Sequence, residues 1–186
     1  MTDFRQQHPN GIILALDQMS AYLQASLTRV WSPIGQTPLV WVSPQRDCVH
    51  FYGALNVISG QEVALPLPKM NADCTLDFVQ HVLTCFPGRA ILFLMDRASW
   101  HKGKVRCFIE DHPDLDLMYF PPGSPNLNPQ EHVWKHAREA VGHLRDYPHI
   151  GDVRKAFQYH LDNTNFHFDW AEKFLPHAFS YGFDFI

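Results

Sequence analysis

The chain has 186 residues, 46% of them hydrophobic and 13% aromatic, and a formal net charge of −4. This composition excludes a disordered chain and predicts one folded domain over residues 1–186, with no apolar run near the ~18 residues of a membrane span. The charge argues against a nucleic-acid binder held only by a broad basic surface, but it is compatible with an acidic metal site that acts on nucleic acid. The polar start lacks a signal-peptide pattern and the four cysteines form no C-x-x-C pair, so we expect reduced thiols in a cytoplasmic protein.

The first half of the chain predicts three strands and a helix. The apolar run GIILALD at 11–17 is typical of a buried strand that ends in an aspartate. Short strands are predicted at 39–43 and 49–57, joined as a hairpin by the turn residues between them. The polar residues after them and the PLPKM stretch at 66–70 are predicted to form a loop. Helical spacing of apolar residues then predicts a helix over 73–86, with its first residue as the N-cap.

The second half alternates strands and helices. RAILFLMD at 89–96 is a second apolar run that ends in an aspartate, and it predicts another buried strand. A weak helix at 102–111 and a strand at 115–120 follow. After a proline-rich loop, apolar residues at helical spacing predict a helix over 129–144 and a last one over 150–163.

The element order is therefore βββαβαβα plus a C-terminal helix, which predicts an α/β fold with a mixed five-stranded sheet and helices on its faces. Asp17 and Asp96 each end a buried strand. Sites in open sheets with helical crossovers lie at the C-terminal ends of the strands. If the two strands are parallel neighbours, the two carboxylates lie side by side.

Two neighbouring carboxylates repel each other unless a cation compensates them, and Mg²⁺ prefers carboxylate oxygens. Glu131, at the start of the helix after the fifth strand, is the natural third ligand, with 34 residues between it and Asp96. Three carboxylates complete a site for two ions, which activates a water or a 3′-hydroxyl for attack on a phosphodiester.

Glu131 also has a purely structural interpretation. Asn128, Pro129, Gln130 and Glu131 fit the first four positions of a helix, so the glutamate could close a capping box onto the Asn128 amide. Taken alone, this spacing favours a cap over a ligand. The coincidence of three acids in these topological positions favours the ligand.

The segments that contain the acids resemble the catalytic domain of DDE transposases of the mariner superfamily, in its bacterial insertion-sequence branch. The most specific features are a histidine five residues after the second aspartate and the motif S-P-x-L-N-P-x-E-x-x-W. The matching segments extend across most of residues 11–141, and they are LALDQ (14–18), WSPIGQTP (31–38), HFYGAL (50–55), LFLMDRASWHKG (92–103) and FPPGSPNLNPQEHVW (120–134).

The resemblance implies a ribonuclease H-like fold with its core at about 11–145, and a DNA transposase that cuts and joins strands at transposon ends. It implies Asp17, Asp96 and Glu131 as both the catalytic triad and the metal ligands, with two ions of Mg²⁺ or Mn²⁺. It also implies a prokaryotic protein associated with the nucleoid. The family often has glutamate after the first acid, where this chain has Gln18.

Full-length relatives carry helix-turn-helix DNA-binding domains before the catalytic domain, whereas only about ten residues precede the first predicted strand here. We therefore expect a separate helix-turn-helix domain or chain as a partner, with DNA as the substrate and a homodimer forming on the DNA. We expect the chain to be the second frame of a split element, a truncated remnant or an isolated catalytic domain. The alternative function is an inactive or domesticated remnant that acts as a nucleic-acid or protein-binding scaffold.

Basic and aromatic residues near the acids are candidates for DNA contact. His101 matches the family motif, and it is expected to contact the scissile region. The other candidates are Arg97, Lys102, Lys135 and Arg138. They could bind DNA phosphates, or they could lie on a solvated surface and pair with acids such as Glu139.

Overall fold

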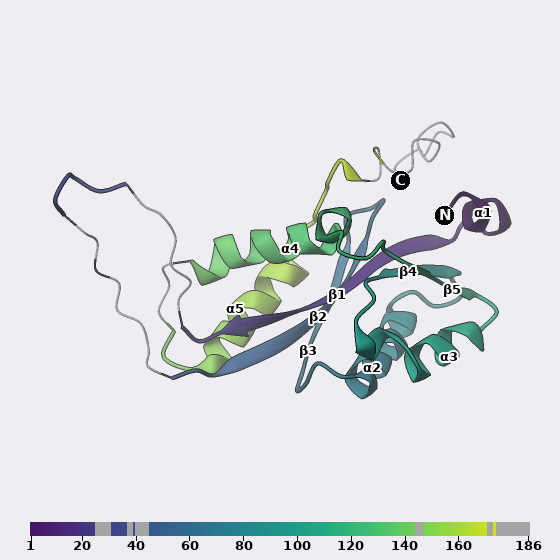
Figure 1. Ribbon diagram of the computed structural model, residues 1–186, viewed down its shortest axis with the longest axis horizontal. Helices are drawn as coiled ribbons and strands as arrows, with labels where there is room; N and C mark the ends of the chain where they lie inside the picture. Colours follow the sequence, from purple (N-terminus) through teal and green to yellow (C-terminus); the bar gives the residue numbers. More distant parts are fainter. Residues whose placement is uncertain (25–30, 37–38, 40–44, 144–146, 171–172, 174–186) are drawn as a thin grey trace.

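The structure is a computed structural model that describes residues 1–24, 31–36, 39, 45–143, 147–170 and 173. Its centre is a five-stranded sheet with the strand order β3-β2-β1-β4-β5 (Figure 1). The strands are β1 (Ile12–Tyr22), β2 (Cys48–Asn56), β3 (Glu62–Leu67), β4 (Ile91–Met95) and β5 (Leu115–Tyr119). β1, β2 and β3 pair antiparallel, whereas β4 pairs parallel with both β1 and β5. The prediction of a mixed five-stranded sheet is confirmed.

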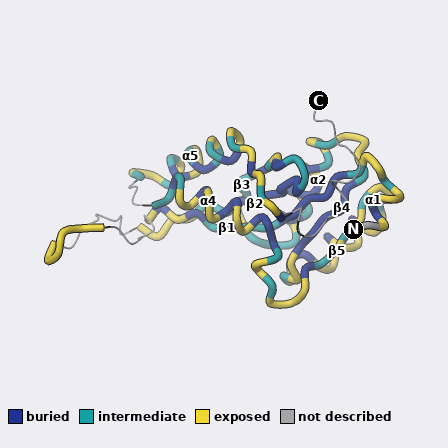
Figure 2. The backbone as a smooth tube through the Cα atoms, turned by 90° about the horizontal axis from the view of Figure 1, so that it is seen from above, coloured by how far each residue is buried: buried dark blue, intermediate teal, exposed yellow. Residues whose placement is uncertain are grey.

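Helices cover both faces of this sheet. The helices are α1 (Thr2–Gln7), α2 (Ala72–Cys85), α3 (Lys104–Glu110), α4 (Gln130–Ala137) and α5 (Ile150–Asp162). One face packs against α2 and α3, and the other packs against α4 and α5 (Figure 1). α4 continues into a π-helical segment at Arg138–Gly142. β1, β2 and β4 are largely buried, while the helices alternate between buried and exposed residues, as amphipathic surface helices do (Figure 2).

β1 connects the two cores because its side chains alternate between the faces of the sheet. Ile12, Leu14 and Leu16 pack in the core under α2 and α3. Met19 and Ala21 point to the opposite face and pack under α4 and α5. A strand with two buried faces reads as a continuous apolar run, which is why its first half was predictable.

Two local predictions need correction, and a third concerns residues outside the described ranges. The third strand of the sheet is β3, at residues that were predicted as loop; its Pro66 is tolerated because β3 is an edge strand. The strand predicted at 39–43 falls mostly outside the described residues, and Leu39 lies in no strand. The N-cap of α2 is Asn71, whose Oδ1 accepts a hydrogen bond from the Cys74 amide at 2.9 Å, instead of Asp73.

All four cysteines are free. Across the described residues, no helix is long and apolar enough to cross a membrane.

Candidate active site

The two aspartates lie at neighbouring positions of adjacent parallel strands. Leu16 pairs with Met95 in the last register position between β1 and β4. Asp17 directly follows Leu16, and Asp96 directly follows Met95. The backbones of the two aspartates therefore lie side by side on adjacent strands, as predicted. Asp17 does not end its strand, however, because β1 continues alongside β2 to Tyr22.

Asp17 interrupts an otherwise apolar row on β1. The residues on the same face are buried, and they are Ile13, Ala15, Met19 and Ala21. Burial is the main cause that raises the pKa of the Asp17 carboxyl from 3.8 to about 7. The backbone N–H of Gln18 opposes this shift, whereas the negative charges of Glu131 and Asp96 add to it. The three acids therefore lie close enough to act on one another.

Asp96 has the opposite electrostatic character. Its Oδ1 lies 2.6 Å from Nδ1 of His101 and accepts a hydrogen bond from the Ala98 amide at 2.9 Å. The hydrogen bond from His101 is the main cause that lowers the pKa of the Asp96 carboxyl. Asp96 is thus the ionised member of the pair over a wide pH range, while Asp17 holds its proton up to near neutral pH.

His101 is fully buried, and its two ring nitrogens are both engaged. Nδ1 faces Asp96, and Nε2 lies 2.8 Å from Nε2 of Gln18. Trp100 Nε1 donates to Oε1 of Gln18 at 2.8 Å, which leaves the Gln18 amide N–H for His101. We therefore assign the Nδ1–H tautomer, which donates to Asp96.

His101 was predicted to contact the scissile region, whereas its side chain has no solvent exposure and contacts the Asp96 carboxylate. Gln18 completes this arrangement, and the sequence offered only a weak signal for its role, namely an amide directly after the first acid. The Tyr119 hydroxyl donates to the His101 carbonyl at 2.8 Å and fixes the backbone of the same turn.

Glu131 lies in the first turn of α4 and is exposed. Asn128 caps the helix, since its Oδ1 accepts the Gln130 amide at 3.1 Å. The Asn128 amide donates to the Pro125 carbonyl at 3.0 Å, so Glu131 does not close a capping box onto it. Across the described residues the Glu131 carboxylate has no recorded hydrogen bond, and its charge acts on Asp17.

The basic candidates are all on the surface. Arg97 lies over the Tyr119 ring at 5.8 Å and donates to the Phe120 carbonyl at 3.4 Å. Lys102 is exposed, and its charge helps to lower the pKa of Asp96. Lys135 faces Glu139 at 4.0 Å, which is the surface pairing that the sequence left open, and Arg138 is exposed on the same helical stretch.

The donor set fits a hard divalent cation. The charges of Glu131 and Asp96 raise the pKa of Asp17, because neighbouring carboxylates repel one another unless a cation compensates them. Carboxylate oxygens are the ligands that Mg²⁺ and Mn²⁺ prefer. The described residues contain no group of three or more such side chains that is already arranged to hold an ion.

A family model described as DDE superfamily endonuclease matches residues 12–154, which include all three acids. The chain belongs to this family. A protein of Sinorhizobium fredii (strain NBRC 101917 / NGR234), "Uncharacterized protein y4pE/y4sA", is 28% identical over 91 residues, covering 48% of this chain and 65% of that protein. The match thus spans slightly less than two thirds of the relative.

Solved structures show that this DDE domain has a ribonuclease H-like fold of the transposase and integrase type. The Mos1 transposase paired-end complex superposes with a TM-score of 0.69 at 15% identity, over 96% of this chain and 56% of that one. The Mos1 mariner catalytic domain gives a TM-score of 0.59 at 15% identity, with 96% and 84% covered. The BIV integrase catalytic core gives 0.52 at 11% identity, with 91% and 97% covered.

Proposed function

We propose that this DDE domain is the catalytic domain of a DNA transposase, which cleaves phosphodiester bonds at transposon ends and transfers the strands to target DNA. The observation that carries the proposal is that Asp17 and Asp96 directly follow the last paired residues of β1 and β4, while the charges of Glu131 and Asp96 both raise the pKa of Asp17. Membership of the DDE endonuclease family supports the reaction class. The fold shared with Mos1 complexes that contain transposon ends supports the substrate.

Asp17, Asp96 and Glu131 would hold two Mg²⁺ or Mn²⁺ ions, as the Mos1 complexes with Mn and Mg support. Bound ions would supply activation of a water or 3′-hydroxyl and stabilisation of the leaving oxygen. Asp96 is prepared for this role because His101 orients its carboxylate and keeps it ionised. Asp17 would lose its proton on binding, since a nearby cation favours the charged form of a carboxyl.

The surrounding cations would position DNA. Arg97 and Lys102 follow Asp96 closely and are exposed, so we assign them to phosphate contacts beside the acids. Arg138 and Lys135, further along the α4 stretch, would extend this contact. The overall charge of −4 leaves recognition of the transposon end to a separate helix-turn-helix chain or domain, and the catalytic domain would act as a homodimer on paired ends.

The test is Mg²⁺- or Mn²⁺-dependent nicking of a plasmid that carries the repeats flanking the gene, with the chain alone and with any helix-turn-helix protein encoded beside it. Asp96→Asn should reduce nicking by more than about 100-fold, because even loss of a group that only orients a metal ligand costs 10–100-fold. Asp116→Asn is the matched control, since Asp116 is an exposed aspartate on β5. Equal activity in the wild type and Asp96→Asn would refute the assignment. Absence of nicking in every arm, with DNA binding retained, would favour the scaffold function.

A further inference from the structure

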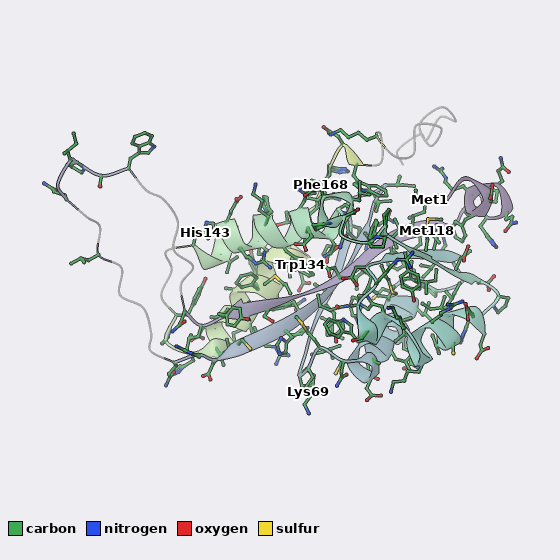
Figure 3. The ribbon with its side chains drawn as sticks, in the orientation of Figure 1. Met1, Lys69, Met118, Trp134, His143 and Phe168 are labelled. Atoms are coloured by element: carbon green, nitrogen blue, oxygen red, sulfur yellow. The ribbon has the colours of Figure 1, made fainter. Side chains whose placement is uncertain are left out.

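A buried polar group lies beneath the start of α4, beside the three acids but not among them. Glu62 at the start of β3 accepts a hydrogen bond from Gln130 Nε2 at 2.7 Å. Gln130 and Trp134 are fully buried, and Trp134 lies beneath α4 on the side that faces the sheet (Figure 3). Gln130 directly precedes Glu131 in the first turn of the helix. The contact therefore joins the edge of the sheet to the turn that carries the third acid.

Several polar atoms of this group have no partner. Oε2 of Glu62, Oε1 of Gln130 and Nε1 of Trp134 are buried and make no hydrogen bond with any described residue. Unpaired buried polar atoms are costly and rare in folded proteins. Two of these atoms, on Glu62 and Gln130, are acceptors when Glu62 is ionised. A carboxylic acid, in contrast, has one O–H donor.

A single proton on Glu62 gives both unpaired oxygen atoms a hydrogen-bond partner. With the proton on Oε2, the Glu62 hydroxyl can donate to Gln130 Oε1 while Gln130 Nε2 donates to Glu62 Oε1. Burial also raises the pKa of Glu62 well above its usual range, opposed by the Gln130 hydrogen bond and by a hydrogen bond with the backbone of Ala54. No charged side chain among the described residues contributes to this shift.

We propose that Glu62 is a neutral carboxylic acid whose pairing with the Gln130 amide positions the first turn of α4, and with it Glu131. Glu62 and Gln130 are then positioning residues, not metal ligands. The neutral state of Glu62 stands on the contacts alone, whereas the consequence for Glu131 rests on the proposed function.

The sheet beneath the pair is shaped to accept it. Gly53 on β2 pairs with Asp17 on β1, so the position below the group is next to the first acid. A Cβ at Gly53 would overlap Gln130 Nε2, Glu62 Oε1 and the Trp134 ring. Glycine inside a strand commonly marks a place where another group approaches closely. The missing side chain makes the space that the acid–amide pair occupies.

The protonation of Glu62 is tested by carboxyl-detected NMR of the chain labelled with ¹³C at its glutamate carboxyls. At about pH 7, where free glutamates are ionised, one resonance should keep the position of a protonated acid, and it should be missing from Glu62→Gln. A spectrum in which every glutamate is ionised at that pH, in a protein with native secondary structure, would overturn the proposal. This measurement needs neither metal nor DNA, so it is independent of the proposed function.

The positioning role is tested by Mn²⁺ affinity, measured from the electron paramagnetic resonance of free Mn²⁺. Gln130→Ala should weaken binding by about tenfold, within the range seen when groups that orient ligands are removed. Gln158→Ala is the matched control, because Gln158 Nε2 donates to the Ala64 carbonyl of the same strand from α5, a different helix from the one that carries Glu131. Its Mn²⁺ affinity should stay within about twofold of wild type.

Two further variants keep the test decisive if Gln130→Ala does not fold. Glu62→Gln retains a neutral partner and should bind Mn²⁺ within about twofold of wild type, and the exchange Glu62→Gln with Gln130→Glu should do the same. Equal losses in Gln130→Ala and Gln158→Ala, or a loss in the exchange variant as large as in Gln130→Ala, would overturn the positioning role. A wild-type chain with no Mn²⁺ affinity would instead refute the proposed function.

Discussion

The buried Asp17 carboxyl makes a prediction about stability that does not depend on activity. Its pKa is raised from 3.8 to about 7. A tenfold change in an ionisation constant is worth about 1.4 kcal/mol, so this difference corresponds to about 4 kcal/mol. Because the folded-state pKa is the higher one, the stabilisation is complete below pH 3.8 and is lost as the pH rises to about 7.

Asp17→Asn removes this titration while keeping the size of the side chain. In metal-free buffer, the wild type and the variant should have similar unfolding free energies at about pH 4. At about pH 8 the variant should be the more stable by about 2–4 kcal/mol, since small movements of the site relieve part of the penalty. Urea unfolding followed by circular dichroism measures both values. The difference between the two proteins cancels titrations that they share, such as that of Asp96.

The reasoning is refuted if the stability gap between wild type and Asp17→Asn is the same at both pH values. Asp116→Asn is again the control, and it should show no such pH-dependent gap because Asp116 is exposed on β5. Saturating Mg²⁺ at about pH 8 should stabilise the wild type by about 3 kcal/mol at 100 times the dissociation constant, and Asp17→Asn by much less. That comparison reports on the metal site separately from the proton.

Two further substitutions test the packing around the acids. Gly53→Ala should lower the unfolding free energy by about 1–3 kcal/mol, because the added Cβ has no room. The control is Gly151→Ala in α5, whose Cβ meets nothing within 4 Å, so that this substitution should be neutral or slightly stabilising. Thermal unfolding compares the two variants, and equal effects would contradict the packing argument. His101→Phe should raise the pKa of Asp96 towards its usual value, because the carboxylate loses the hydrogen bond from His101. It should also lower the unfolding free energy by about 1–3 kcal/mol, because the Gln18 amide loses its partner. An NMR titration of Asp96 that matches the wild type would contradict the first effect.

The sequence was informative wherever a local pattern determines the structure. Apolar runs before Asp17 and Asp96 predicted two buried strands, and the structure shows the parallel pairing that the sequence reasoning had set only as a condition. The start of α4 was predictable because Asn128 and Pro129 are local capping and helix-starting residues. These features depend on neighbours in the chain, whereas the ribonuclease H-like fold was implied by the resemblance to DDE transposases.

Other features depend on residues that are far apart in the chain. β3 was missed because Pro66 argues against a strand unless one knows that the strand lies at an edge. The burial of His101 depends on Gln18, which is 83 residues away. The contact between Glu62 and Gln130 spans 68 residues, and no local periodicity in the sequence indicates it.

The parallel ladder between β1 and β4 has a consequence for how the site tolerates mutation. The backbones beneath Asp17 and Asp96 are held at the spacing of adjacent strands, about 4.8 Å, by main-chain hydrogen bonds that no single side chain controls. The position of Glu131 is set by side chains at the end of a loop and a helix. Sequence drift in the core should therefore leave the first two acids in place and misalign the third. In a lineage that loses activity while keeping Asp17, Asp96 and Glu131, we expect the first structural change at the start of α4.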